Sequence, residues 1–506
     1  MALLFDISSY LSDLLFSKAP ENPAPPNVHI VPCSTVDLSF GRKERVLTLS
    51  LVIDTCLDAP TLEQTLSTLV VHKFPRAGAR LVLRNEELEF HIPSTFDADH
   101  PPIAFTAHHY RETYASPTRP DIRGALSNSS DSAPSLLGPL PSLEMYSRSP
   151  ACPVRMHGFL VPNTPLLQVH VSVFDDLTII GVTSSEIMFD VAGMRTLLDT
   201  WTRLLSGTDI EKIQGMDLNM ASPFARFKDP AWTQGIRGYD SCEPLMLFMN
   251  FEAWLVSLLR DREEEMLIRV PKAYLEDRRL EIMGDLKLQG SSERVETADV
   301  LMAWWLKTSY SHRKSDDKTP IWIHLSVDLR PMHIFTVSSS SGSDAPSPLT
   351  DPYIHNASST IPLLPPPLAS ELQSTSLGAL ALRIRRAITA YIAHPALIEK
   401  ELAWLNHNPR RELIRGEEHE TQTDWAAARF SELDFSGARA LESECKGSGR
   451  VLFVLPKTVL EPYMPLWGHG AILMEDENAF WMSQVKGREE WEEIRSGGQG
   501  GRVVLN

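Results

Sequence analysis

A short stretch of the sequence, residues 185–193, holds two carboxylates, side chains that can take part in acid–base chemistry. Glu186 and Asp190 lie four residues apart in it, after an apolar segment. A carboxylate can take or give a proton in catalysis when its pKa lies close to the working pH. The ordinary pKa of glutamate is about 4.3, so burial would have to raise it by about two units to make a base at neutral pH. A carboxylate in this stretch could therefore act as an acid or base only where the fold buries it.

The motifs of several other catalytic classes are absent from the sequence. It contains no GxSxG elbow, no HExxH pair and no Walker phosphate loop. Its five cysteines include no CxxC pair, so the sequence predicts neither a zinc site nor a disulfide framework. We expect no metal in the site.

Two strands and a helix must position the Glu186 stretch. Leu166 to Phe174 alternates apolar and polar residues, and a turn at Asp175 and Asp176 leads into a second strand, Leu177 to Val182. Apolar residues then recur at helical spacing from Met194 to Leu205. The pattern predicts that Glu186 lies where a buried strand passes into a helix.

The rest of the chain alternates helical and strand patterns, which favours a mixed α/β fold. The spacing predicts a helix from about Thr297 to Ser309, with Thr297 as its N-cap. Residues 115–142 and 338–348 are rich in serine and proline, and we interpret both as polar surface loops.

Composition and charge limit the class of protein. The 506 residues are 43% hydrophobic and 22% charged, values typical of a folded chain of several domains. The net charge of −17 disfavours binding to nucleic acid or to anionic membranes. The sequence has no basic leader and no apolar run of about 18 residues. We predict a cytoplasmic protein, a monomer, whose partner is a small-molecule substrate.

The stretch Ser185-Glu186-Ile187-Met188-Phe189-Asp190-Val191-Ala192-Gly193 resembles the HHxxxDxxG signature of the BAHD acyltransferases. The resemblance is to their fungal branch, which includes trichothecene acetyltransferases. Segments with the family's order and spacing extend it over roughly residues 30 to 495: Phe90-His91-Ile92-Pro93, Ser326 to Arg330 (NxxxLR), Pro352 to Asn356 (YxGN), Thr423-Asp424-Trp425 (TxW) and Asp434 to Ala438 (DFGWG).

The resemblance implies a fold. It predicts an α/β chain of two chloramphenicol acetyltransferase-like domains with an interdomain tunnel. The domains would be residues 1–205 and 266–506, joined by a crossover segment at residues 206–265.

The resemblance also implies roles for individual residues in catalysis. Glu186 stands at the position of the family's base, which is a histidine. His355 stands where the family turn has glycine, and is either a tolerated turn residue or a relocated acid, base or hydrogen-bond donor. Thr423 matches an oxyanion donor. We predict Glu186, His355 and Thr423 as the catalytic residues.

Five further residues receive binding or structural roles from the resemblance. Trp425 matches a channel wall, with a core tryptophan as the alternative, and Ser185 is predicted to contact substrate. Asp190 would hold the site's backbone with Arg330 as its partner, and Asp434 resembles a structural residue remote from the tunnel.

Three functions remain open. The loss of the histidine base favours an enzyme of secondary metabolism repurposed for cyclisation or condensation of a polyketide- or terpenoid-type intermediate, which requires no cofactor. The alternative is an acyltransferase that uses acyl-CoA as co-substrate to acylate a hydroxyl or amine. The third is a non-catalytic binding protein, in which Glu186 is a decayed position.

Overall fold

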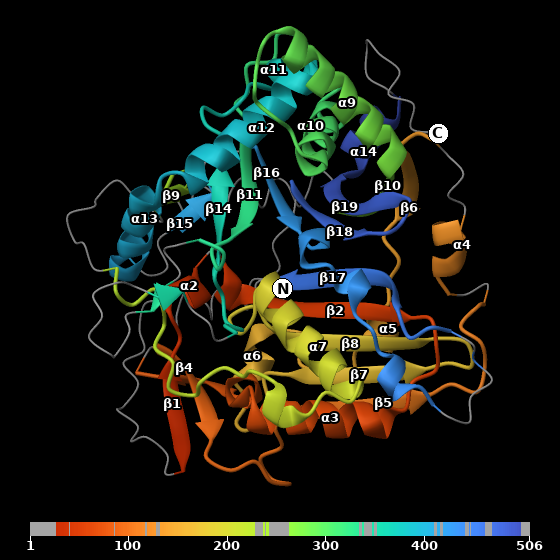
Figure 1. The fold of residues 1–506 in the computed structure, drawn as a ribbon, viewed down its shortest axis with the longest axis vertical. Helices are drawn as coiled ribbons and strands as arrows, with labels where there is room; N and C mark the ends of the chain where they lie inside the picture. Colours follow the sequence, from red (N-terminus) through yellow and green to blue (C-terminus); the bar gives the residue numbers. More distant parts are fainter. Residues whose placement is uncertain are drawn as a thin grey trace, which may run out of the picture.

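The computed structural model describes residues 27–496, apart from residues 40, 86, 117–118, 128–131, 228–235, 238, 242–262, 333–335, 338–346, 349–351, 409–411, 415–417, 441–444, 446 and 461–467. These residues form the predicted mixed α/β structure, with a five-stranded and a seven-stranded sheet (Figure 1). No helix in this part of the chain is long and apolar enough to cross a membrane.

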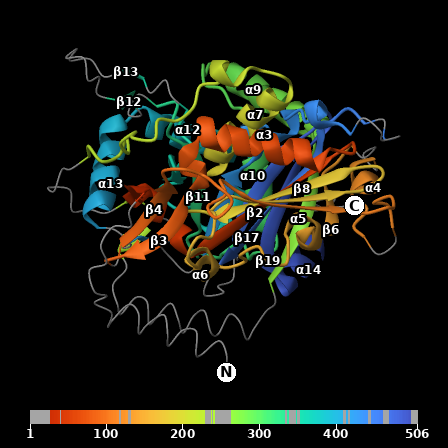
Figure 2. The ribbon, with the colours of Figure 1, turned by 90° about the horizontal axis from the view of Figure 1, so that it is seen from below.

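The five-stranded sheet holds the Glu186 stretch. Its strands run in the order β17-β2-β8-β7-β5. β7 (Gln168–Val173) and β8 (Thr178–Ser185) pair antiparallel, which confirms the predicted hairpin. Helix α7 (Val191–Leu205) follows directly, and it packs with α3 (Ala59–His72), as Figure 2 shows from below. The other strands are β2 (Arg45–Ile53), β5 (Ala104–His109) and β17 (Val451–Leu460).

The seven-stranded sheet forms the second half of the molecule, in the order β14-β11-β16-β18-β19-β10-β6. Its strands are β6 (Ser135–Pro139), β10 (Glu263–Pro271), β11 (Trp322–Asp328), β14 (Ser358–Pro362), β16 (His419–Asp424), β18 (His469–Glu475) and β19 (Ala479–Gly487). The helices of this half include α9 (Lys272–Leu288), α10 (Thr297–Ser309), α11 (Ala369–Ser374), α12 (Leu377–Ile392), α13 (Pro395–His407) and α14 (Arg488–Ser496).

Helix α10 has the predicted bounds, but its predicted cap is wrong. The N-cap is Glu296, whose backbone is extended and whose N–H donates to Asp299 Oδ2 at 2.7 Å. Thr297 is the first helical residue instead. Glutamate is an uncommon N-cap residue. The usual preference for serine or threonine at the N-cap therefore selected Thr297, one residue after the true cap.

Two strands cross between the halves of the chain. β17, from the second half, pairs antiparallel with β2 along the edge of the first sheet. β6, from the first half, pairs with β10 at the edge of the second sheet. The prediction that residues 115–142 form only a loop is therefore wrong, because α4 (Ile122–Ser127) and β6 lie within them. The domain boundaries at residues 205 and 266 stay a prediction. β17 and β6 each join the sheet on the other side of these boundaries.

Side chains of β17, the edge strand of the first sheet, contact β10 and β19 of the second sheet. Phe453 on β17 packs edge-on against Trp481 at 6.0 Å between ring centroids. Lys457 Nζ lies 2.8 Å from Glu265 Oε2. A cavity of about 250 Å³ is lined by Phe453, by Leu267 and by residues of α4 and β6. Its lining does not include Glu186, so a tunnel through Glu186 stays a prediction.

Smaller elements complete the described fold. A three-stranded sheet of order β1-β4-β3 lies beside α2 (Thr35–Leu38). Its strands are β1 (Val28–Pro32), β3 (Arg80–Arg84) and β4 (Glu87–Pro93). The remaining short elements are α5 (Glu144–Ser147), α6 (Met156–Phe159), the pair β9 (Tyr239–Ser241) and β15 (Glu412–Ile414), and the pair β12 (Thr336–Val337) and β13 (Ser347–Pro348).

Candidate active site

The Glu186 carboxylate is held at the end of β8 by two groups from neighbouring strands. The Glu186 N–H donates to the Arg45 carbonyl at 3.0 Å, which extends the β2–β8 pairing by one residue. Thr458 Oγ1 on β17 donates to Glu186 Oε1 at 2.9 Å, and an Arg45 guanidinium nitrogen lies 3.8 Å from Oε2. The side chain is 17% exposed. Two oxygens offer about four acceptor positions, so the carboxylate can still accept a proton from a ligand.

His355 is a buried, neutral imidazole. Its ring stacks on Phe90 at 5.0 Å, and Nδ1 lies 3.2 Å from the Met188 carbonyl. A carbonyl can only accept, so Nδ1 carries the proton and Nε2 is an acceptor with no hydrogen-bond partner among the described residues. Burial, aided by the charge of Arg76, lowers the pKa of His355 to about 3.

These features decide between the roles predicted for His355. A histidine with this pKa is not protonated at neutral pH, and its one N–H is used by Met188. This state favours a role as an acceptor over a role as an acid or as a hydrogen-bond donor, and the role of His355 in the site stays a prediction. Its φ is also not in the left-handed region, where glycine would be favoured. The remaining ring nitrogen, Nε2, can only accept a hydrogen bond.

Asp190 and Arg330 lie together, as their predicted pairing requires. Arg330 donates to both carboxylate oxygens of Asp190, at 2.8 and 3.1 Å. Asp190 also accepts the N–H groups of Gly193 and Ala357, at 2.8 and 2.7 Å. Burial alone would raise the pKa of Asp190, but the Arg330 charge and these hydrogen bonds outweigh it and hold the pKa below its usual value. The pair joins the start of α7 to residues 353–357.

The approach of α7 to this segment requires a glycine. A Cβ at Gly193 would lie 1.9 Å from the Ile354 carbonyl oxygen, closer than a carbon atom can approach an oxygen to which it is not bonded. Arg330 fixes the same segment from the other side, because it donates to the carbonyls of Tyr353 and His355 at 3.0 and 2.6 Å. The last glycine of the matched stretch is therefore explained by close packing.

Thr423, Trp425 and Ser185 occupy different surroundings. Thr423 lies on β16 opposite Ala471 of β18. Trp425 is 6% exposed and packs against Phe430, as a core tryptophan would. Ser185 is 1% exposed and accepts the Ile187 N–H at 3.2 Å. Since side chains alternate along a strand, Ser185 points to the opposite face of the sheet from Glu186, and the structure does not bring the two together.

Asp434, which the resemblance gives a structural role, is exposed. Its Oδ1 accepts the Ser436 N–H at 2.8 Å in an exposed turn. An aspartate that accepts an amide two residues ahead is a local turn feature, and it does not require burial.

Replacing Asp434 with asparagine is expected to change the free energy of unfolding by less than about 0.5 kcal/mol, because the amide oxygen of asparagine can accept the same N–H. Urea unfolding of the purified variant would measure this change. A loss above about 1 kcal/mol would mean that Asp434 makes a further interaction in the folded state.

Arg45 and Thr458 are the two neighbours of Glu186 that the sequence analysis missed. Arg45 stands at the charged start of an apolar strand, a signal that could have drawn attention to it. Thr458 is far from Glu186 in sequence and had no such signal, because its position depends on β17 joining the first sheet. No group of acidic, histidine and cysteine side chains suited to a metal ion occurs in the described ranges.

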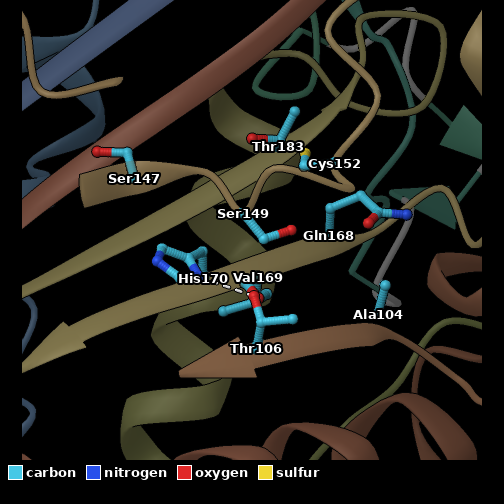
Figure 3. Close-up of a pocket in the computed structure, with 9 residues that line it drawn as sticks. All are labelled: Ala104, Thr106, Ser147, Ser149, Cys152, Gln168, Val169, His170 and Thr183. Atoms are coloured by element: carbon cyan, nitrogen blue, oxygen red, sulfur yellow. Dashed lines mark hydrogen bonds between the residues drawn. The ribbon is translucent and has the colours of Figure 1, made fainter. Parts of the chain in front are cut away.

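A second hollow lies on the other face of the first sheet (Figure 3). Thr106, Gln168, His170 and Thr183 line it, and Thr106 Oγ1 lies 2.7 Å from His170 Nδ1. Its volume of about 10 Å³ suits a single water molecule rather than a substrate. The candidate site therefore remains at Glu186.

The chain is similar to several curated fungal proteins, most of them named as acetyltransferases and one as a transcriptional regulator. Acetyltransferase adrJ of Penicillium roqueforti is 28% identical over 458 residues, which are 83% of this chain and 85% of adrJ. Transcriptional regulator calD of Penicillium decumbens is 26% identical over 365 residues, which are 69% of each protein. No family model matches the chain.

The fold is shared with a solved structure. F. sporotrichioides TRI101 complexed with coenzyme A and T-2 superposes with a TM-score of 0.65 at 15% identity, over 92% of this chain and 97% of that one. With the acetyltransferase relatives, this likeness confirms both the predicted two-domain α/β fold and the resemblance that the sequence motifs indicated.

Proposed function

We propose that this chain, a BAHD acyltransferase-like enzyme, transfers an acyl group from an acyl-CoA thioester to a hydroxyl or amine of a small molecule of secondary metabolism. The observation that carries the proposal is the Glu186 carboxylate, held at the family's base position by Thr458 and Arg45 and still partly exposed. The acetyltransferase relatives, and the coenzyme A complex of a protein with the same fold, support acyl transfer over the cyclisation favoured from the sequence alone.

The proposed reaction begins with proton removal by Glu186. The carboxylate takes the proton of the acceptor hydroxyl while the oxygen attacks the thioester carbonyl carbon, and the carbonyl electron pair moves onto its oxygen. The resulting oxyanion re-forms the carbonyl and breaks the carbon–sulfur bond. The CoA thiolate then takes the proton from Glu186. The products are an ester and the CoA thiol, and Glu186 returns to its starting state.

Other untested predictions enter the proposal, with the role of His355 changed to that of an acceptor. We place the protein in the cytoplasm as a monomer, with domains at residues 1–205 and 266–506 and a crossover at 206–265. Its net charge of −17 argues against nucleic-acid and membrane partners. His355 accepts a hydrogen bond from the alcohol or amine substrate, and Trp425 lines the substrate channel. Asp190 and Arg330 hold the backbone of the site in place.

The purified full-length chain, incubated with acetyl-CoA or longer acyl-CoAs and a panel of fungal alcohols and amines, tests this function. We expect release of the CoA thiol together with a product one acyl group heavier. A chain that neither releases the thiol nor binds any acyl-CoA saturably would overturn the proposal and favour a binding protein.

Cyclisation remains a second candidate because a carboxylate stands where the family has histidine. A carboxylate can remove an acidified C–H proton or protonate a leaving group without a CoA thioester. The variant Glu186→His separates the two functions. If the variant catalyses acyl transfer and the parent does not, the parent enzyme catalyses a different reaction. If the parent already transfers acyl groups, cyclisation is the weaker account.

Replacing Thr458 with valine is expected to lower kcat by about tenfold while KM changes little, because one hydrogen bond orients the carboxylate. Thr458 is a positioning residue, so Thr458→Ser, which keeps the hydroxyl, should restore kcat. Steady-state kinetics of the three proteins would measure both effects. An unchanged kcat in the valine variant would mean that Arg45 alone holds Glu186.

A further inference from the structure

Acyl transfer through a charged intermediate needs hydrogen-bond donors for the oxyanion. Preorganised donors of this kind usually supply the largest single share of catalysis. We infer that Thr421 on β16 and His469 on β18 are these donors. The inference rests on the proposed function and names the residues that would make it efficient. The family resemblance assigned the oxyanion to Thr423 instead, two residues further along the same strand.

The sheet register places Thr421 and His469 side by side. They are direct partners in the parallel pairing of β16 with β18. Adjacent strands lie about 4.8 Å apart, so one oxygen atom can bond to both side chains. Thr421 and Thr423 are about 6.6 Å apart along one strand, which exceeds what a single oxyanion can bridge with two hydrogen bonds of about 2.8 Å.

Thr421 points away from the helices that cover this sheet. Its neighbour Glu420 is fully buried on the helix side, where Lys486 and Tyr310 bond to it. Gln422 points the same way and bonds to Gln484 at 2.9 Å. Because side chains alternate along a strand, Thr421 must face the other side of the sheet.

That other side is the one that meets the first sheet. His469 and Ala471 share a face of β18, and Ala471 pairs with Ser483 of β19. Two residues before Ser483, on the same face, Trp481 packs against Phe453 of the first sheet. The face that carries His469 therefore looks toward β17, on whose other side Thr458 holds Glu186.

Both proposed donors have an N–H or O–H to give. The Thr421 hydroxyl oxygen is buried without a hydrogen-bond partner in the part of the chain that the structure describes. A buried polar group without a hydrogen-bond partner lowers the stability of the folded state by about 1–3 kcal/mol. The presence of the Thr421 hydroxyl therefore calls for an explanation. His469 is only half-buried, and its ring packs edge-on against His419 at 5.7 Å.

The charge state of His469 suits a donor. Partial burial, helped by the charge of Arg45, lowers its pKa well below the usual value, so the ring is neutral and keeps one N–H. A neutral imidazole can polarise a carbonyl oxygen without losing its proton. Arg45, whose charge contributes to this lowering, also lies 3.8 Å from Glu186.

The two donors act without being consumed. When the acceptor oxygen bonds to the thioester carbon, the carbonyl electron pair moves to the oxygen, and Thr421 and His469 each donate one hydrogen bond to it. When the carbon–sulfur bond breaks, the pair returns and the hydrogen bonds weaken. Loss of one such donor lowers kcat by about 10²- to 10³-fold in a comparable site.

Kinetics of Thr421→Val and His469→Phe with acetyl-CoA test the inference. Each variant is expected to lower kcat by about 10²-fold or more with KM nearly unchanged. Thr421→Ser keeps the hydroxyl and should restore kcat. His419→Phe changes the neighbouring ring on the same sheet and serves as the matched control, with a kcat within a few-fold of the parent and the same melting temperature as His469→Phe.

The outcomes separate the inference from the function on which it rests. If the parent transfers acyl groups and Thr421→Val does so equally well, the inference fails and the function stands. A lowered kcat in Thr423→Val with an unchanged kcat in Thr421→Val would identify Thr423 as the hydrogen-bond donor to the oxyanion. Equal losses in the His469 and His419 variants, with lowered melting temperatures, would overturn a catalytic role for His469. If the parent transfers no acyl group, function and inference fail together.

Discussion

Replacing Glu186 with glutamine is expected to lower kcat by roughly 10² to 10⁴ while acyl-CoA and acceptor binding survive. Glutamine keeps the shape of the side chain and can still accept the Thr458 hydrogen bond, but its amide cannot take a proton at neutral pH. Binding should survive because apolar surroundings, rather than one carboxylate, supply most of the affinity for a small ligand. Single-turnover rates and equilibrium binding of acyl-CoA would measure the two effects separately.

The matched control for this variant is Glu265→Gln. Glu265 is also paired with a cation near β17, Lys457 at 2.8 Å, and its side chain is 20% exposed against 17% for Glu186. It lies outside the proposed site, so its variant should keep the parent's kcat. A Glu186→Gln variant with the parent's kcat would remove Glu186 from the mechanism and leave substrate positioning as the surviving account.

The local part of the site could be predicted from the sequence because local patterns determine it. The alternation before Ser185 and the helical spacing after Asp190 were enough to place Glu186 between β8 and α7. The pairing of Asp190 with Arg330 was reached only through the family resemblance, since the two residues are distant in sequence.

The surroundings of Glu186 could not be predicted, because they depend on contacts between remote segments. Thr458 reaches Glu186 only because β17 leaves its own half of the chain to extend the first sheet. β6 makes the reverse crossing from a segment whose serine and proline content predicted a loop. Strand exchange of this kind has no local pattern, so it appears only in the assembled sheets.

The state of His355 illustrates a second limit of sequence reasoning. Its residue type allowed acid, base or donor, and only burial against Phe90 and the Met188 carbonyl fixed it as a neutral acceptor. For Asp434 the motif match indicated a structural role but not that its side chain is exposed. In both cases the decisive quantity was solvent exposure, which a single position in a sequence does not encode.

Replacing Asp190 with alanine is expected to lower the free energy of unfolding by about 3–5 kcal/mol, because it breaks one side of a buried ion pair and leaves Arg330 with Asp328 alone. The variant also removes the N-cap of α7, which contributes about 1 kcal/mol of this loss in comparable helices. Urea unfolding would measure the change. Asp328→Ala is the matched control, since it removes the more exposed of the two carboxylates that contact Arg330 and should cost less.

The pH dependence of the free energy of unfolding tests the charge of the Asp190–Arg330 pair. The cavity that Asp190→Ala leaves would not give the same pH dependence. The folded-state pKa of Asp190 lies below its usual value, so the folded state favours the ionised carboxylate. The stability that this provides is fully present above the unfolded pKa of about 3.9 and is lost as the pH falls through the lower folded pKa. The difference in unfolding free energy between the parent and Asp190→Asn should therefore be constant from neutral pH down to about pH 5 and shrink below about pH 4. A difference that stays constant in acid would mean that Asp190 acts through its shape and hydrogen bonds, and that its charge contributes nothing to holding α7 against residues 353–357.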